Sequence, residues 1–129
     1  MNSGSKTILV VDDSKEIREL VATTLENEES IVLIAEDAIE ALQMSRKHKP
    51  HLIIMDVGMP GKINGIEATR QIKADHQTKD CVVIMLSGDR DKTNIRRALD
   101  AGAYDYLTKP FSPLELIEKV ETILEGSCQ

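Results

Sequence analysis

The chain has 129 residues, of which 41% are apolar and 29% are charged, so it can bury one hydrophobic core but is too short for two ordinary domains. Its net charge of -6 argues against a nucleic-acid partner, because proteins that bind a phosphate backbone usually carry a basic face. No apolar run approaches the length of a membrane span or of a signal-peptide core. We therefore expect one cytoplasmic domain without a membrane contact, ordered over about residues 6–126.

Short apolar runs of strand length alternate with segments of helical spacing along the chain. These runs are rich in Val, Ile and Leu and lack polar alternation, which is typical of strands buried on both faces of a parallel sheet. The expected strands are residues 7–11, 31–35, 51–55, 81–86 and 103–107. With right-handed crossovers, this alternation predicts an α/β fold with a doubly wound, five-stranded parallel sheet and five helices. We expect the flavodoxin-like strand order 2-1-3-4-5, which is one of the known orders of such sheets.

Local signals mark the ends of several predicted helices. Asp13, Asp37 and Ser112 each stand three residues before a glutamate, which is the spacing of a capping box at a helix start. Gly102 and Gly126 stand where the fourth and fifth helices are expected to end. These signals agree with the boundaries that the apolar pattern predicts.

Charged side chains directly follow three of the predicted strands. Asp12 and Asp13 follow the first strand, Asp56 the third and Lys109 the fifth. In the predicted order the first and third strands are neighbours, so the carboxylates would gather at one sheet edge, about 5 Å apart. Two such charges repel each other by roughly 3 kcal/mol at an effective dielectric constant of about 20. The cluster therefore calls for positive charge, from Lys109 and from a divalent metal ion.

Magnesium suits this set of ligands. Mg²⁺ accepts a few carboxylates, retains several waters and binds phosphate oxygens, whereas Ca²⁺ would require more protein oxygens than this edge supplies. The three histidines, His48, His51 and His76, do not gather at the predicted edge. We expect them to be exposed surface residues rather than ligands of zinc or of another transition metal.

Four short motifs resemble the receiver domain of two-component response regulators, and the match spans essentially the whole chain. The motifs are Asp12-Asp13, Met55-Asp56-Val57-Gly58-Met59-Pro60-Gly61, Ser87-Gly88 and Lys109-Pro110-Phe111. The chain looks most similar to a stand-alone, chemotaxis-type receiver, because no output domain follows in the sequence. We accordingly expect a single receiver domain over residues 1–129.

The resemblance implies a phosphorylation site that uses Mg²⁺. Asp56 would be the phosphoacceptor, and its carboxylate would attack a phosphoryl group supplied by a sensor histidine kinase or a phosphotransfer protein. Asp13, Asp56 and the main-chain carbonyl of Gly58 would hold Mg²⁺, with Asp12 binding directly or through water. The protein would be a phospho-accepting signalling module, and its only catalysis would be its own phosphorylation and slow dephosphorylation.

The resemblance also implies a conformational switch. Lys109 would pair with one phosphoryl oxygen, and Ser87 would move to donate its hydroxyl to another. The ring of Tyr106 would then turn inward, and the face made by the fourth helix, fifth strand and fifth helix would recruit a downstream protein or output domain. We expect a monomer or a weak, phosphorylation-dependent dimer, and a cis peptide between Lys109 and Pro110.

Each motif also has a simpler interpretation. The adjacent aspartates could merely cap the first helix. Ser87 could be an ordinary turn residue. Tyr106 could be plain core, with Tyr104 as the exposed aromatic residue. Asp56 is harder to explain in this way, because an unpaired charge at the end of an Ile-Ile-Met run is costly.

Proteins of other classes share parts of the pattern. A phosphorylation-independent interaction module of the same fold would not need Asp13, Asp56 and Lys109 together. A metal-dependent aspartyl phosphatase usually carries a second acid two residues after the nucleophile, where Gly58 stands. A flavin-binding protein would want a Ser/Thr/Gly-rich phosphate loop after the first strand, where Asp12 and Asp13 would repel the phosphate.

The chain departs from the common receiver pattern in one loop. Residues 61–64 stand between Pro60 and Gly65, one more than usual, and Asn64 replaces a frequent aspartate. We expect this loop beside the site to differ in shape from that of a typical receiver.

Overall fold

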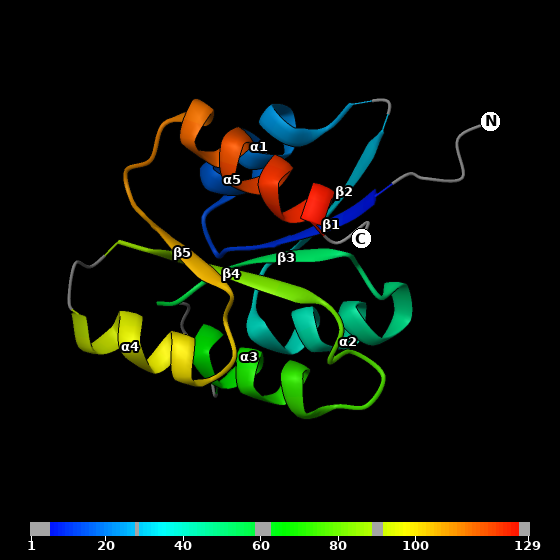
Figure 1. The fold of residues 1–129 in the computed structure, drawn as a ribbon, viewed down its shortest axis with the longest axis vertical. Coiled ribbons are helices and arrows are strands. Elements are labelled where there is room, and N and C mark those ends of the chain that lie inside the picture. The colour runs from blue at the N-terminus through cyan, green and yellow to red at the C-terminus, as the bar shows by residue number, and fades with distance from the viewer. Residues whose placement is uncertain (1–5, 28, 59–62, 89–91, 127–129) are drawn as a thin grey trace.

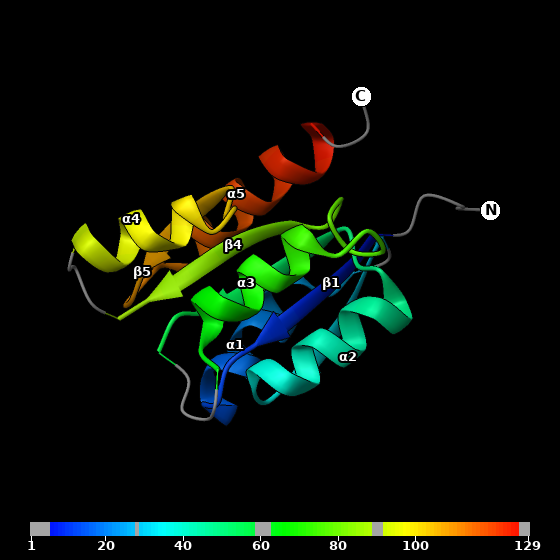
Figure 2. The same cartoon turned by 90° about the horizontal axis from the view of Figure 1, so that it is seen from below.

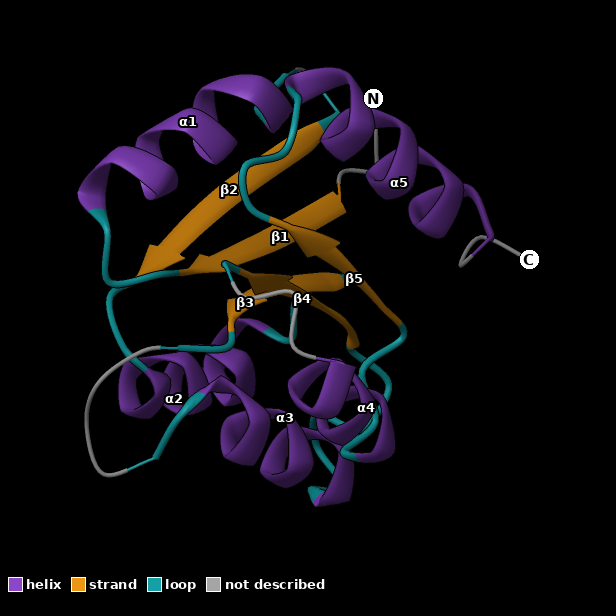
Figure 3. Ribbon diagram, turned by 90° about the vertical axis from the view of Figure 1, so that its left-hand side faces the viewer, coloured by secondary structure: helices purple, strands orange, loops and turns teal. Residues whose placement is uncertain are grey.

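The computed structural model describes residues 6–27, 29–58, 63–88 and 92–126. In chain order the elements are β1 (Lys6–Val11), α1 (Lys15–Leu25), β2 (Ser30–Ala35), α2 (Ala38–His48), β3 (Leu52–Asp56), α3 (Gly65–Ala74), β4 (Val82–Ser87), α4 (Lys92–Asp100), β5 (Asp105–Thr108) and α5 (Pro113–Gly126). Helices α1 and α5 cover one face of the sheet, and α2, α3 and α4 cover the other (Figure 1). Figure 3 shows the strands as a layer between these two layers of helices.

The sheet has the strand order β2-β1-β3-β4-β5, and all four neighbouring pairs are parallel. The predicted flavodoxin-like fold and strand order are therefore confirmed. The third and fourth strands each begin and end one residue later than predicted, so that Asp56 and Ser87 are their last residues. The fifth strand begins at Asp105 rather than at residue 103, because residues 103–104 belong to the connection from α4.

The core explains why the strands read as continuous apolar runs. Ile8 and Val10 of β1 pack in the cluster under α1 and α5, while Leu9 and Val11 pack in the cluster under α2, α3 and α4. All four side chains are fully buried, because each face of the sheet is covered by helices. Figure 2 shows α2, α3 and α4 lying side by side across one face. Burying one such side chain stabilises the fold by about 1.5–3 kcal/mol.

Two of the predicted helix starts are confirmed. The Asp37 carboxylate accepts a hydrogen bond from the main-chain N–H of Glu40 at 2.8 Å. Ser112 and Glu115 form a reciprocal capping box, in which each side chain accepts the other residue's main-chain N–H at 3.0 Å. These caps satisfy donors that the first turn of a helix leaves without partners.

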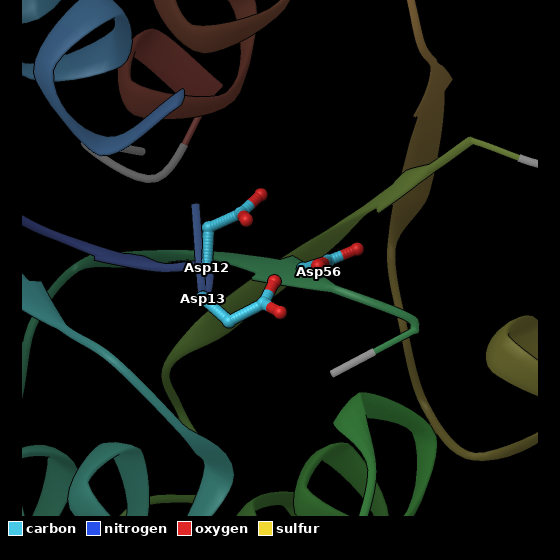
Figure 4. Close-up of side chains that lie close together, drawn as sticks. All are labelled: Asp12, Asp13 and Asp56. Carbon is cyan, nitrogen blue, oxygen red and sulfur yellow. The ribbon is translucent and has the colours of Figure 1, made fainter. Parts of the chain in front are cut away.

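The prediction that Asp13 caps the first helix was wrong. Ser14 is the cap of α1, and its hydroxyl oxygen accepts the main-chain N–H of Ile17 at 3.3 Å. The carboxylate of Asp13 lies instead among the acidic side chains at the end of β1 (Figure 4). A serine stands directly before the helix and can make the capping bond, which leaves the aspartate available for the site.

Other local predictions agree with the structure. Gly102 follows α4 with a left-handed φ of 116°, α5 ends at Gly126, and the Lys109–Pro110 peptide is cis. His48, His51 and His76 are all exposed. Within the described ranges, no helix is both long and apolar enough to cross a membrane.

Candidate functional site

Three carboxylates meet at the carboxyl ends of two neighbouring strands. Asp12 and Asp13 follow β1, Asp56 ends β3, and these strands pair directly. One oxygen from each residue lies within 4.8 Å of the others, and Figure 4 shows the three side chains grouped at this edge. The predicted convergence of the acids is therefore confirmed, and it follows from the parallel arrangement of the strands.

Asp12 is a fully buried carboxylate whose two oxygens both have donors. Its Oδ1 accepts the main-chain N–H of Ser14 at 2.8 Å, and its Oδ2 accepts from Lys109 Nζ at 3.0 Å. Buried charge is tolerated only when it is paired and hydrogen-bonded, and both conditions hold here. Asp13, by contrast, is exposed, so this side of the cluster faces solvent.

Lys109 is the cation that joins the strand ends. Its Nζ lies 3.0 Å from Asp12 Oδ2 and 3.4 Å from Asp56 Oδ1. Burial is the largest single influence and lowers the pKa of Lys109, but the hydrogen bond to Asp12 and the charges of Asp56 and Asp12 together raise it further than burial lowers it. The net pKa is raised, so Lys109 is an ammonium at neutral pH.

The single lysine does not neutralise the site. Burial raises the pKa of Asp56 above 3.8, and the charge of Asp12 raises it further. Lys109 and the N–H of Gly58, which donates to Asp56 Oδ1 at 3.2 Å, lower this pKa but do not cancel the rise. The ionised form of Asp56 is therefore less favoured than that of a solvent-exposed aspartate, and additional positive charge at the site would stabilise it.

The residues present suit a hard divalent cation. All three side chains offer carboxylate oxygens, and the exposure of Asp13 leaves one side open to water, as Mg²⁺ requires. Gly58, the predicted source of a main-chain ligand, follows Asp56 closely and is exposed. A Cβ atom built on Gly58 would meet nothing within 4 Å, so the space beside this residue is open.

A pocket of about 370 Å³ opens beside Asp56. It is lined by Asp56, Val57, Gly58, Ser87, Gly88, Asn94 and Lys109. The structure thus brings the predicted acceptor together with Ser87 and Lys109. Asn94, in the first turns of α4, was not predicted, because sequence periodicity does not show which residue of α4 reaches over the sheet edge.

Main-chain pairing between the ends of β4 and β5 fixes the positions of Ser87 and Lys109 relative to each other. Ser87 pairs with Thr108 in the register of the two strands, and the main-chain N–H of Lys109 donates to the Ser87 carbonyl at 2.7 Å. Ser87 is 2% exposed. Its hydroxyl and the Lys109 ammonium therefore border the same small space from adjacent strands.

Comparison with known proteins identifies the family. A sequence model described as the response regulator receiver domain matches residues 8–121. The chain belongs to this family. The earlier resemblance, drawn from four motifs, is confirmed.

Receiver domains of several bacteria are similar over most of this chain. The phosphate regulon transcriptional regulatory protein PhoB of Pseudomonas aeruginosa is 42% identical over 119 residues, which cover 92% of this chain and 52% of PhoB. The alkaline phosphatase synthesis transcriptional regulatory protein PhoP of Bacillus subtilis is 39% identical over 123 residues, covering 95% and 50%. The chain thus spans about half the length of these relatives. The expectation of a stand-alone protein stays a prediction.

Solved structures agree with the receiver assignment. A putative response regulator from Chloroflexus aurantiacus has a TM-score of 0.87 and 35% identity, covering 94% of this chain and 98% of its own. The chemotaxis response regulator CheY4 of Vibrio cholerae has a TM-score of 0.85 and 31% identity, covering 92% and 98%. Both are similar to this receiver domain over almost their whole length.

The two tyrosines of this receiver domain lie in different environments. Tyr104 is 63% exposed, whereas Tyr106 is half-buried against the core cluster under α2, α3 and α4. Tyr106 pairs in register with Met85, two residues before Ser87 on the adjacent strand. Tyr104 is the exposed ring, as in the simpler interpretation of the two tyrosines, while a switching role for Tyr106 stays a prediction.

Gly65 supports Asp56, the predicted phosphoacceptor, through backbone packing. A Cβ atom at this position would lie 2.0 Å from the main-chain oxygen of Asp56 and 3.0 Å from Met55 Cγ. Only glycine therefore lets the first turn of α3 pack against the end of β3 without displacing it. The sequence places Gly65 after the helix cap Asn64, but this close approach emerges only from the folded structure. Of the loop that precedes this cap, residues 61–62 lie outside the described residues, so its predicted shape is not compared.

Proposed function

We propose that this receiver domain accepts a phosphoryl group on Asp56, with Mg²⁺ bound beside it, and then changes its α4–β5–α5 face to control a partner in two-component signal transduction. One observation carries the proposal: Asp56 is a buried carboxylate within reach of two further acids and of the Lys109 ammonium. Repulsion among these carboxylates destabilises the fold unless a bound cation offsets it. With the cation in place, the site can also bind an anionic group.

The chemistry assigns each residue a part. A carboxylate oxygen of Asp56 would attack the phosphorus of a phosphohistidine, forming a P–O bond as the P–N bond breaks, and the imidazole would leave with the electron pair. The Lys109 ammonium would offset charge on the phosphoryl oxygens, and the Ser87 hydroxyl would donate a hydrogen bond to one of them. The protein acts in this scheme as a phosphoacceptor rather than as an enzyme with turnover.

Asp12, Asp13 and Asp56, with the main-chain carbonyl of Gly58, would hold the metal. When bound, Mg²⁺ supplies positive charge that offsets the repulsion of the carboxylates and the charge of the transferring group. The exposed side of the cluster at Asp13 would leave room for the waters that Mg²⁺ retains.

The output face would lie on the far side of the phosphorylation pocket. On it, Tyr104 and Leu114 are each 63% exposed, and Lys119 binds Asp105 across β5 and α5 at 2.6 Å. A shift of Ser87 toward phosphoryl oxygens would leave space for the Tyr106 ring and change this face. The phosphoryl group can drive the change only by contacting one state more strongly than the other.

The partners follow from this scheme and from the relatives. A sensor histidine kinase or phosphotransfer protein would be the donor. Two relatives are transcriptional regulatory proteins by name, which favours an output that acts on transcription. The receiver itself, with a net charge of -6, would not contact nucleic acid directly.

Acetyl phosphate with Mg²⁺ tests the acceptor assignment. Intact-mass measurement should show one added phosphoryl group on the wild-type protein, none on Asp56→Asn, and none after chelation of the metal. Asp37→Asn is the matched control, because it makes the same substitution at an exposed aspartate and keeps a capping side chain. The same mass gain in Asp56→Asn would remove Asp56 from the role.

A second experiment tests the switch. Lys109→Ala should still accept some phosphate, but the amide resonances of α4 and β5 should not move as they do in the phosphorylated wild type. Equal resonance changes in the two proteins would contradict the proposed coupling through Lys109.

A further inference from the structure

Arg18 of α1 is a second cationic side chain that contacts the acidic edge. Its Nη1 donates to the main-chain carbonyl oxygen of Asp12 at 2.9 Å. Over the described ranges it forms no salt bridge, and its Nε is buried without a hydrogen-bond partner. A buried donor without a partner destabilises a fold, so the position of this guanidinium requires an explanation.

The carbonyl that Arg18 contacts belongs to the peptide that joins Asp12 to Asp13. The side chain of Asp12 is held independently, by the N–H of Ser14 and by Lys109. The Asp13 carboxylate, in contrast, accepts no hydrogen bond from any described residue, so its direction depends on the backbone that carries it. The hydrogen bond from Arg18 acts on the peptide plane from which the Asp13 residue continues, so it bears on the direction in which the Asp13 side chain leaves the chain.

The charge of Arg18 also suits this position. A guanidinium keeps its charge at all relevant pH values and is more weakly hydrated than an ammonium, so it tolerates partial burial near carboxylates. In the phosphorylated state, the charges of Asp12, Asp13 and an acyl-phosphate dianion would be balanced by a divalent ion together with Lys109 and Arg18.

We infer that Arg18 is a positioning residue for the metal site: its hydrogen bond to the Asp12 carbonyl orients the Asp12–Asp13 peptide so that the Asp13 carboxylate faces Mg²⁺. This inference rests on the proposed function, because it assumes that these acids hold the ion. Arg18 itself touches neither the ion nor the phosphoryl group.

Titration calorimetry with Mg²⁺ tests the inference. Arg18→Met should weaken Mg²⁺ binding roughly tenfold, as loss of an outer support of a metal ligand commonly does, and Arg18→Lys should restore most of the affinity. Lys15→Met is the matched control, because it removes the same charge from an exposed position on the same helix. An unchanged Kd in Arg18→Met, or an equal loss in Lys15→Met, would overturn the positioning role.

A measurement on the metal-free protein separates positioning from general damage. In Arg18→Met the amide hydrogens of Asp13 and Ser14 should exchange faster, while those of β3 and β4 keep their wild-type protection. If Arg18→Met does not fold, Arg18→Ala replaces it, because alanine also lacks a side-chain donor and suits a helix, and a wild-type Kd in that folded variant overturns the inference. Failure of the wild-type protein itself to bind Mg²⁺ would instead refute the proposed function.

Discussion

Polar and charged groups have different partners at the two ends of the sheet. At the carboxyl ends of β1 and β3, Asp12 and Asp56 are buried near each other, and the pKa of Asp56 is raised by burial and by Asp12. At the amino ends, the N–H of Lys6 donates to the Glu29 carbonyl at 2.8 Å, and His51 Nδ1 accepts the N–H of Thr7 at 3.0 Å. Polar groups at the amino end thus have separate partners, whereas carboxylates at the carboxyl end compete for one lysine.

The larger of two pockets is not at the end of the sheet where the carboxylates gather. The larger pocket, about 450 Å³, lies at the amino end between α1 and α5, and the pocket beside Asp56 is about 370 Å³. The larger one combines an apolar floor, including Leu25 and Val120, with exposed acidic side chains such as Glu121. Unresolved repulsion between buried charges therefore marks the candidate site better than volume does.

The largest loss of stability should follow substitution of the glycine that packs closely at each end of the sheet. Gly65→Ala should destabilise the protein by about 3 kcal/mol, because the new Cβ would overlap the Asp56 carbonyl, and it should also slow phosphorylation. Gly102→Ala, at the opposite end, should destabilise through its left-handed φ and its contact with Lys73 while leaving phosphorylation unchanged. Chemical denaturation and phosphorylation rates distinguish the two.

Gly58→Ala serves as the control for both glycines, since its Cβ would meet nothing. An equal loss of stability in Gly58→Ala and Gly65→Ala would mean that the close approach to the Asp56 carbonyl does not explain the cost.

The second effect concerns the repulsion itself. In metal-free buffer, Asp13→Asn should stabilise the protein by about 1 kcal/mol, because Asp13 adds negative charge near Asp12 and Asp56 and accepts no hydrogen bond from the described residues. The same substitution should remove the stabilisation that Mg²⁺ gives to the wild-type protein. Thermal unfolding with and without Mg²⁺ measures both, and a metal-free Asp13→Asn that unfolds below the wild type would contradict the prediction.

A fall in pH should change the contributions of Asp56 and His51 to the free energy of unfolding in opposite directions. The folded-state pKa of Asp56 is raised, so in metal-free protein its contribution to stability is lost as pH rises through that pKa and returns as pH falls toward 3.8. The pKa of His51 is lowered by burial and then by Lys6, so its contribution falls as pH drops below 6.5. Urea unfolding across this range should show the first effect missing in Asp56→Asn and the second missing in His51→Gln.

The smallest effect should follow charge removal in the amino-end pocket. Glu121→Gln should change the free energy of unfolding by less than about 0.5 kcal/mol, as exposed substitutions usually do, and should leave phosphorylation unaltered. A marked loss of phosphorylation in this variant would show that the two ends are coupled.

Much of this architecture could be predicted from the sequence because strong, local rules govern it. Strands buried on both faces must be apolar throughout, and Asp12 and Asp56 must meet if their strands are parallel neighbours. Capping by Asp37 and Ser112 depends on residues within one turn. At the first helix the sequence offered two possible caps, Asp13 and Ser14. The capping-box spacing favoured Asp13, but Ser14 makes the bond.

The remaining features depend on contacts between separate elements. Asn94 of α4 lines the same pocket as Ser87, the last residue of β4, and Arg18 reaches back from α1 to the end of β1. The need for glycine at position 65 arises where α3 meets the Asp56 carbonyl. Periodicity assigns such residues to a face of an element but does not say which atom of another element they will touch.

The hydrogen bond from the Lys109 N–H to the Ser87 carbonyl makes the two strand ends a single mechanical unit. In the proposed scheme, a backbone displacement at one of these strand ends would be transmitted to the other through this bond. Substitutions of side chains around this hydrogen bond could therefore change how the receiver responds to phosphorylation. Loss of the hydrogen bond itself would separate binding of the phosphoryl group from movement of the two strand ends.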